Sequence, residues 1–200
     1  MITPTYIPPA PVPRGEQSLL LLGLDPGFAN IGWAFLRLLP SKSESGTMGL
    51  ITTEKSDKKR NVYSVDDNVR RAMEIHDALD LQLSMASGIT AICAEAMSFP
   101  RSSKVSAQIA MTWGVICSLC KKYKISLLQV SPQQAKVRVC GIKTASKLEI
   151  QAALDTAFPN AADNVSHLPK SKWEHPYDAL AAALACSQDD SIQMVRRLLL

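Results

Sequence analysis

Three apolar segments near the N-terminus, separated by short polar breaks, predict strands of one sheet. Residues 18–25 read SLLLLGLD, and such an almost continuous apolar run is typical of a central strand that is buried on both faces. Aliphatic and aromatic residues at 32–39 predict a second strand, and 48–53 predict a third. Turn-forming residues occupy 25–27 and 40–46. Because short turns connect antiparallel neighbours, we expect an antiparallel meander.

In the rest of the chain, helical periodicity alternates with two further apolar strands. These strands are predicted at 89–95 and 125–130, and the flanking helices supply the crossovers that parallel strands need. Ser146 and Glu149 have the spacing of a capping box. The apolar faces of the long helices comprise Val69, Met73, Ile75, Leu79 and Leu83 in 64–87, and Val105, Ile109, Trp113, Ile116 and Cys120 in 104–123. The other predicted helices are 132–139, 146–158 and one from His175 or Pro176 to about 187, with loops at 55–61 and 160–173.

This order predicts an α/β fold with a five-stranded mixed sheet, three antiparallel strands and then parallel ones, flanked by helices. With 200 residues and 46% hydrophobic content, one globular domain is expected at 18–190. Residues 1–17 contain five prolines and predict a flexible tail, and 191–200 are expected to form a C-terminal tail. The chain shows neither an apolar run long enough to span a membrane nor a secretion signal, so we expect an intracellular protein.

The cysteines and the charges narrow the picture further. Five cysteines, mostly in apolar segments, favour reduced thiols, and a lone Cys117–Cys120 pair with CxxC spacing makes a zinc site an unfavoured alternative. The net charge is +4, yet residues 96–148 contain no Asp or Glu. Such a block suggests binding to a phosphate backbone, although a lysine-rich solvated surface would have the same composition. Its nine basic residues are Arg101, Lys104, Lys121, Lys122, Lys124, Lys136, Arg138, Lys143 and Lys147.

Three acidic residues adjoin apolar runs: Asp25 and Glu95 end predicted strands, and Asp178 lies near the start of the last helix. Burying a carboxylate is costly unless its charge is compensated, and a divalent metal ion is the simplest compensation. Pro176 suits the first helical position, which would put His175 at the N-cap, three residues before Asp178 and able to serve the same ion. Glu174 is the alternative ligand, and a capping histidine beside a surface Asp is the structural alternative.

Four motifs, in order and spacing, resemble the RuvC family of Holliday junction resolvases over residues 19–187. They are GLDPGFANIGWA, AEAMSFPRSSKVSAQIAMTWGVI, SPQQAKVRVCGIKTASKLEIQ and HPYDALAAALA. The resemblance implies an RNase H-like fold and a metal-dependent endodeoxyribonuclease that resolves four-way DNA junctions by paired symmetric nicks. Further alternatives are an RNase H-like nuclease acting on flaps, forks or other branched DNA, and a non-catalytic junction-binding protein.

The resemblance also implies roles for individual residues. Two Mg²⁺ or Mn²⁺ ions per active site would be held by Asp25, which bridges both, by Glu95 and Asp178, and by His175. Lys147 would lie near the scissile phosphate, and Phe99 would stack on an unpaired base. Further DNA-binding residues would be Arg101, Lys104, Lys136, Arg138 and Lys143.

The near two-fold symmetry of a junction implies a homodimer, and the helix at 104–123 could bring two copies together through its small residues. A branch-migration helicase remains an unidentified further partner. The expected location is the cytoplasm or nucleoid, or another DNA-containing compartment such as an organelle or a virus-infected cell.

Overall fold

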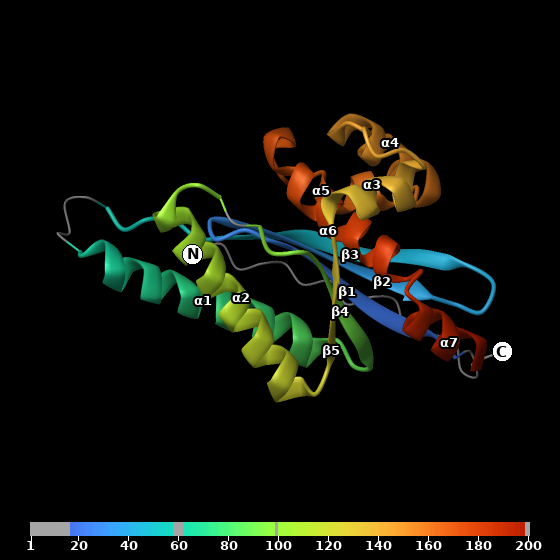
Figure 1. Cartoon of the computed structure of the whole chain (residues 1–200), viewed down its shortest axis with the longest axis horizontal. Helices are drawn as coiled ribbons and strands as arrows, with labels where there is room; N and C mark the ends of the chain where they lie inside the picture. The colour runs from blue at the N-terminus through green and yellow to red at the C-terminus, as the bar shows by residue number, and fades with distance from the viewer. Residues whose placement is uncertain (1–16, 58–61, 99, 199–200) are drawn as a thin grey trace.

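A computed structural model describes residues 17–57, 62–98 and 100–198, and its centre is a five-stranded sheet of order β3-β2-β1-β4-β5 (Figure 1). The pairs β1–β2 and β2–β3 are antiparallel, whereas β1–β4 and β4–β5 are parallel. The predicted fold class is therefore confirmed. The strands are β1 (Leu19–Pro26), β2 (Asn30–Leu38), β3 (Ser43–Thr52), β4 (Ile89–Glu95) and β5 (Ser126–Val130).

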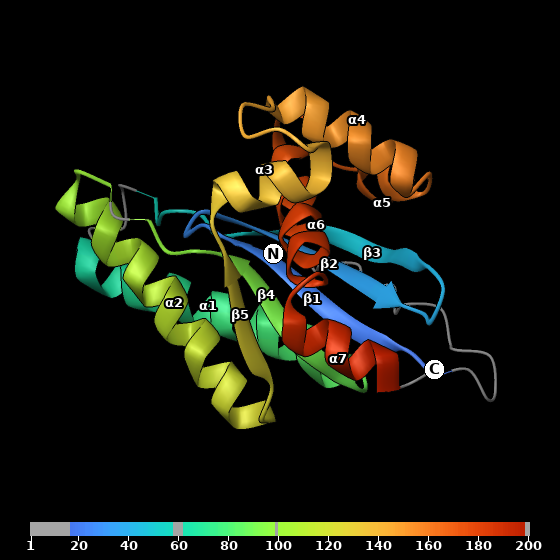
Figure 2. The ribbon, with the colours of Figure 1, turned by 45° about the vertical axis from the view of Figure 1, so that its right-hand side comes forward.

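Helices cover both faces of this sheet (Figures 1 and 2). α1 and α2 lie side by side on one face, while α6 crosses the other face, with α3 and α4 packed against α6 and α5 packed against β3. The side chains of β1 alternate between the two layers: Leu20 and Leu22 pack toward α1 and α2, and Leu21 packs toward α6. β1 is thus the buried central strand that the sequence predicts. The helices are α1 (Ser64–Met85), α2 (Ser103–Tyr123), α3 (Pro132–Cys140), α4 (Lys147–Ala157), α5 (Ala161–Val165), α6 (Glu174–Cys186) and α7 (Asp190–Leu198).

Two capping boxes define where α3 and α4 begin. The hydroxyl of Ser131 accepts a hydrogen bond from the backbone N–H of Gln134, and the hydroxyl of Ser146 accepts one from the backbone N–H of Glu149. In return, the side-chain oxygens of Gln134 and Glu149 accept from the backbone N–H groups of Ser131 and Ser146. The capping box expected at Ser146 is therefore confirmed. It makes Lys147 the first residue of α4 and fixes the direction in which its side chain leaves the helix.

α6 lies close against the sheet because two glycines leave room for its backbone. A Cβ atom on Gly23 of β1 would lie 2.0 Å from the carbonyl oxygen of Ala179, and one on Gly32 of β2 would lie 1.9 Å from that of His175. Any larger residue at either position would force the helix away. The alanine-rich sequence of α6 suits the same close contact, since Ala179 and Ala183 are fully buried.

Three expectations about the last 41 residues are wrong. The segment 160–173 is not simply a loop, because it contains α5 and a 3₁₀ turn at Lys170–Lys172. α5 is held against β3 by the side-chain amides of Asn160 and Asn164, which donate to the carbonyl oxygens of Ser45 and Gly46. In addition, α6 begins at Glu174 with Trp173 at the N-cap, so His175 lies within the first turn rather than at the cap.

The third expectation is that the helix ending near residue 187 is the last ordered helix and that residues 191–200 form a tail. Instead α7 follows, with Ile192 buried at 4% exposure. Arg196 donates to the carbonyl oxygens of Leu39 at 2.9 Å and Lys42 at 3.0 Å, which ties α7 to the turn between β2 and β3. Most of the proline-rich tail, part of the loop at 55–61 and the last two residues lie outside the described residues.

The buried face of α1 also differs from the prediction. Val69 and Met73 are 48% and 63% exposed, while the polar residues Asp67, Arg71 and Gln82 face the core beside Ile75, Leu79 and Leu83. On α2 the difference is smaller, since Val105 is 41% exposed but Trp113, Ile116 and Cys120 are buried as expected. A helical period alone does not choose between two half-apolar faces.

All five cysteines are free thiols, as expected: Cys93, Cys120 and Cys186 are buried, Cys140 is partly buried and Cys117 is exposed. Within the described ranges, no helix combines the length and the apolar character needed to cross a membrane.

Candidate active site

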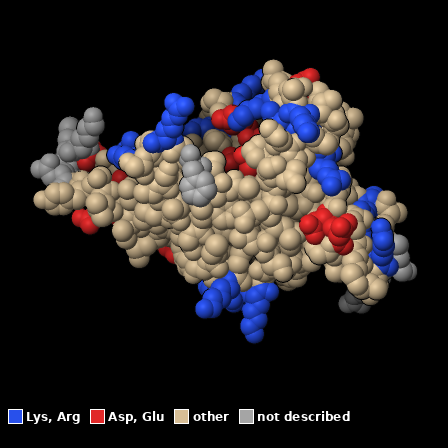
Figure 3. Space-filling model, in the orientation of Figure 1, with Lys and Arg blue, Asp and Glu red and all other residues tan. Residues whose placement is uncertain are grey.

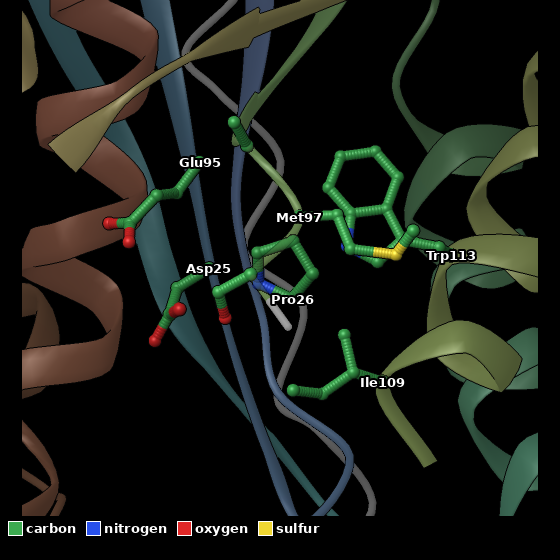
Figure 4. Close-up of a pocket in the computed structure, with 8 residues that line it drawn as sticks. Asp25, Pro26, Glu95, Met97, Ile109 and Trp113 are labelled. Carbon is green, nitrogen blue, oxygen red and sulfur yellow. The ribbon is translucent and has the colours of Figure 1, made fainter. Parts of the chain in front are cut away.

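Asp25 and Glu95 lie beside each other at the ends of two neighbouring parallel strands. Leu24 of β1 pairs with Ala94 of β4, so the residues that follow them emerge together at the same edge of the sheet. Figure 4 shows both carboxylates pointing to one side of the sheet, whereas Met97, Ile109 and Trp113 lie on the other side. A small hollow at this edge is lined by residues of both strand ends and by Met97, Ile109 and Trp113.

The first turn of α6 adds His175 and Asp178 to this edge. His175 Nδ1 lies 2.7 Å from Asp25 Oδ2, and the side chains of His175, Asp178 and Asp25 are each only 21–23% exposed. The close approach of α6 at Gly32 places the His175 backbone directly over β2. The structure thus brings His175 into contact with Asp25, and it places Glu95 and Asp178 near enough to Asp25 for their charges to interact.

Burial, together with nearby negative charge, raises the pKa of two carboxyl groups at this edge, Glu95 and Asp178. Burial raises the pKa of Glu95 to about 7, with the negative charges of Asp25 and Asp178 adding to the rise and Lys147 and Lys136 opposing it. Burial is also the main cause that raises the pKa of Asp178, and Asp25 and Glu174 contribute. Concentrated negative charge with little water around it is unfavourable until a cation neutralises it.

Lys147 supplies part of this neutralising charge. Its Nζ lies 2.5 Å from Glu174 Oε2 and 3.4 Å from Asp178 Oδ2. Partial desolvation would lower the pKa of Lys147, but the hydrogen bond to Glu174 and the charges of Asp178 and Glu174 outweigh it and raise that pKa. The same contact with Lys147 is the main cause that lowers the pKa of Glu174.

The donor set suits a divalent cation. Three carboxylates and one imidazole are ligands that Mg²⁺ or Mn²⁺ accepts. The raised pKa values of Glu95 and Asp178 come mainly from burial and partly from negative charge nearby, and a cation would offset both effects. Among the residues that the structure describes, no three His, Cys, Asp or Glu side chains are yet close enough to hold one ion together.

A model of one family, described as the crossover junction endodeoxyribonuclease RuvC, matches residues 21–186. That range is most of the chain and contains all four converging residues. The chain belongs to the RuvC family.

Individual RuvC proteins are distant relatives of this chain in sequence. The RuvC of Natranaerobius thermophilus is 25% identical over 170 residues, covering 85% of this chain and 95% of the relative. The RuvC of Prochlorococcus marinus strain MIT 9312 is 29% identical over 165 residues, covering 82% of this chain and 93% of the relative.

Two solved structures share the fold of this RuvC-family chain. The structure of T. thermophilus RuvC in complex with a Holliday junction substrate matches with a TM-score of 0.67 at 18% identity, over 84% of this chain and 93% of that one. The yeast mitochondrial Holliday junction resolvase Ydc2 matches with a TM-score of 0.63 at 13% identity, over 98% of this chain and 85% of that one.

The basic residues expected to bind DNA fall into different places in the RuvC fold. Figure 3 shows acidic atoms in a recess with Lys and Arg atoms on either side of it. Lys136 is half-buried and near enough to oppose the rise of the Glu95 pKa. Arg101, Lys104 and Lys143 are exposed on the segments that begin α2 and precede α4.

One of the expected DNA-binding residues, Arg138, stands apart from this recess. Arg138 donates to Gln188 Oε1 at 2.7 Å, beyond the C-terminal end of α6, whereas Glu174 is at the other end of the helix. A helix of this length spans about 20 Å, so the structure does not bring Arg138 to the carboxylates. Phe99 lies outside the described residues, and its expected stacking role stays a prediction.

Sequence reasoning missed two contacts at the recess. Glu174 holds Lys147, although it was considered only as an alternative metal ligand. Lys172, in the segment expected to be a loop, donates to Asn30 Oδ1 at 2.9 Å and so joins the 3₁₀ turn to the start of β2. The run KSKWEH had signalled nothing more than a polar loop, since it has neither apolar periodicity nor a recognisable cap.

Proposed function

We infer that this chain is a crossover junction endodeoxyribonuclease that hydrolyses phosphodiester bonds in four-way DNA junctions. The observation that carries the proposal is the convergence of Asp25, Glu95 and Asp178 at one edge of an RNase H-like sheet, in a chain that the RuvC family model matches from 21 to 186. The relatives named as crossover junction endodeoxyribonucleases are matched over nearly their full length, which supports carrying the activity over to this chain.

We further propose that the site works with two divalent cations, Mg²⁺ or Mn²⁺. When bound, such ions lower the pKa of water and neutralise charge on a phosphate. Asp25 would contribute to both ions, and Glu95 and Asp178 to one each. His175, held by its Nδ1 contact with Asp25 Oδ2, would complete the set or orient the attacking water. Oxygen ligands favour Mg²⁺, and the imidazole shifts the preference toward Mn²⁺.

The surrounding basic residues would hold the DNA. Lys147, whose ammonium already lies 3.4 Å from Asp178 Oδ2, would neutralise charge on the scissile phosphate. Lys136, Lys143, Arg101 and Lys104 would contact flanking phosphates, which gives orientation without sequence preference. Phe99 would stack on an unpaired base, and that role remains a proposal from the family resemblance alone.

Symmetric nicking of a junction further requires two active sites, so we propose a C2 homodimer that acts in a DNA-containing compartment. The exposed side of α2, where a Cβ on Gly114 would meet no atom within 4 Å, offers a surface on which two copies could approach.

A cutting assay tests the proposal. The natural chain and an Asp25→Asn variant would be incubated with a synthetic four-way junction, labelled on each strand in turn, in Mg²⁺ or Mn²⁺. We expect paired symmetric nicks from the natural chain and a rate at least about 100-fold lower from the variant, since even residues outside the ligand shell change activity by about 10–100-fold. Asp163→Asn, a change at an exposed position on α5, is the matched control and should cut normally.

Flap, fork and linear duplexes serve as competing substrates in the same assay. Preferential cutting of flaps or forks would reassign the substrate while keeping the carboxylate mechanism. Junction binding without any cutting by the natural chain would contradict the proposed enzyme.

A further inference from the structure

Glu174 forms an ion pair with Lys147 at the rim of the site, and the proposed reaction gives Glu174 itself no role. Each is the first residue of its helix, Glu174 on α6 and Lys147 on α4. The 2.5 Å contact between Lys147 Nζ and Glu174 Oε2 leaves the same ammonium 3.4 Å from Asp178 Oδ2, so Lys147 bridges two carboxylates that lie one turn apart on α6.

The carboxylates around the recess therefore differ in their surroundings. Burial raises the pKa of Glu95 and of Asp178, whereas the Glu174 side chain is 40% exposed and its closer contact with Lys147 lowers its pKa. Glu174 Oε1 is 3.8 Å from His175 Nε2 and thus lies on the outer side of that imidazole, away from Asp25, which contacts Nδ1. This arrangement suits a residue that holds a neighbour better than one that ligates an ion.

The ion pair contributes little to stability. Lys147 is 61% exposed, and ion pairs between solvent-exposed side chains contribute between about 0 and 1 kcal/mol. Lysine loses considerable rotamer freedom when it is fixed, so an exposed ammonium aimed at Asp178 needs an anchor. The capping box at Ser146 and Glu149 fixes the backbone of Lys147, and Glu174 fixes its tip.

We propose that Glu174 is a positioning residue that holds the Lys147 ammonium beside Asp178, and that it is not a metal ligand. The predicted effect of Glu174 on the cutting rate rests on the proposed function. The predicted Mn²⁺ affinities and the predicted anchoring of the Lys147 ammonium do not depend on that function. It also assigns the ligand set to Asp25, Glu95, His175 and Asp178 and leaves Glu174 outside it.

A double-mutant cycle with Glu174→Gln and Lys147→Met tests this assignment. Single-turnover cutting of the junction should slow about tenfold in Glu174→Gln, and Glu174→Asp should recover part of the loss because it keeps the carboxylate. In the Lys147→Met background, Glu174→Gln should cause no further loss, since the two residues act as one unit. A further loss there, or a normal rate in Glu174→Gln alone, would overturn the positioning role.

Mn²⁺ binding to the metal-free protein, measured by titration calorimetry, supplies the second readout. If Glu174 is no ligand, Glu174→Gln should leave the Mn²⁺ dissociation constant within about threefold in both backgrounds, whereas loss of a ligand should weaken binding tenfold or more. Lys147→Met should tighten Mn²⁺ binding, because it removes a positive charge beside Asp178. Lys121→Met removes a charge from the exposed C-terminal end of α2 and should leave Mn²⁺ affinity unchanged.

The third readout needs neither metal nor DNA. Nuclear magnetic resonance should detect the Lys147 ammonium protons as slowly exchanging in the natural chain and in Glu174→Asp, and as fast exchanging in Glu174→Gln. If the chain cuts no branched DNA, the proposed function fails while this readout and the calorimetry still decide the role of Glu174. Fast exchange in the natural chain would contradict the anchored ammonium.

Discussion

A buried arginine supports the turn that follows the first carboxylate of the site. Arg71 is 2% exposed, its guanidinium lies 4.4 Å from the ring centroid of Phe28, and its Nε donates to Thr53 Oγ1 at 3.0 Å. That hydroxyl donates in turn to the Phe28 carbonyl oxygen at 2.7 Å. A buried cation is stable only with such partners, so α1 and the segment after β3 together hold the turn beside Asp25.

Asp67, one turn before Arg71 on α1, makes the stability of the protein depend on pH. Asp67 is 7% exposed, and hydrogen bonds from Ser56 and Arg70 lower the pKa of its carboxyl from 3.8 to about 2. A carboxyl with a lowered folded pKa stabilises the protein above its unfolded pKa, and this contribution is lost as the pH falls toward the folded value. The natural chain should be more stable than Asp67→Asn by about 2 kcal/mol at pH 7, and the difference should shrink between pH 4 and pH 2.

Urea unfolding at a series of pH values measures this difference. Asp66→Asn is the matched control, because Asp66 is an exposed neighbour in the same helical turn. A difference between the natural chain and Asp67→Asn that stays constant down to pH 3 would contradict the assigned pKa.

Some features of the site can be predicted from the sequence, and others cannot. Asp25 and Glu95 could be predicted because each directly follows an apolar strand, and Asp178 because it opens an alanine-rich helix after a proline. The pairing of Glu174 with Lys147 could not, since 27 residues separate them and the contact depends on how α4 lies against α6. A local sequence pattern predicts where a strand ends, but it does not predict how two helices pack against each other.

Among the elements, α6 decides the shape of the recess because it carries both His175 and Asp178 onto the sheet. Its distance from the sheet depends on Gly23, where any side chain would meet the Ala179 carbonyl group. Gly23→Ala should therefore displace α6, cost about 1–3 kcal/mol and lower the melting temperature by roughly 3–10 °C. Calorimetric melting and Mn²⁺ titration should show both a lower melting temperature and weaker metal binding.

Gly114→Ala is the opposite case and serves as the control. Its added Cβ would meet no atom within 4 Å, and alanine is preferred over glycine inside a helix by about 1 kcal/mol. We expect this variant to be slightly more stable than the natural chain, with unchanged metal affinity. A Gly23→Ala protein as stable as the natural chain would mean that α6 lies farther from β1 than described.

The elements themselves were largely predictable, and the failures have identifiable causes. All five strands were located because they are short, apolar and bounded by turn residues. The wrong face of α1 was chosen because Val69 and Met73 are apolar, whereas the core contacts of Arg71 and Gln82 depend on partners elsewhere in the fold. α7 was missed because its single buried side chain, Ile192, leaves a weak apolar pattern.

For the whole molecule, folding divides the basic block of 96–148 into two groups. Lys136, Lys143 and Lys147 lie on segments that follow β5 or begin α4, at the same end of the sheet as Glu95. Lys121 and Lys124 are exposed at the C-terminal end of α2, which leads into the start of β5 and is therefore at the opposite end. DNA drawn to the first group would meet the carboxylates.

The salt dependence of junction binding should separate the two groups. The logarithm of the binding constant falls linearly with the logarithm of the salt concentration, and each lysine that contacts a phosphate adds about 0.9 to the steepness of that fall. Lys136→Ala should reduce the magnitude of this slope by about that amount, whereas Lys121→Ala should leave it unchanged. Fluorescence anisotropy with Asp25→Asn as the background avoids cutting during the titration. Equal slopes for the two lysine variants would contradict the assigned DNA path.

The contact between Asp25 and His175 joins residues 150 positions apart, one on the first strand and the other near the end of the chain. A ribosome that adds about 5–20 residues per second needs roughly 8–30 s to pass from one to the other. During that interval the nascent chain has Asp25, and later Glu95, but lacks the helix that completes the carboxylate set. A half-synthesised chain therefore lacks two of the four proposed metal ligands, and under the proposed mechanism a message truncated before α6 yields a fragment that does not cut DNA.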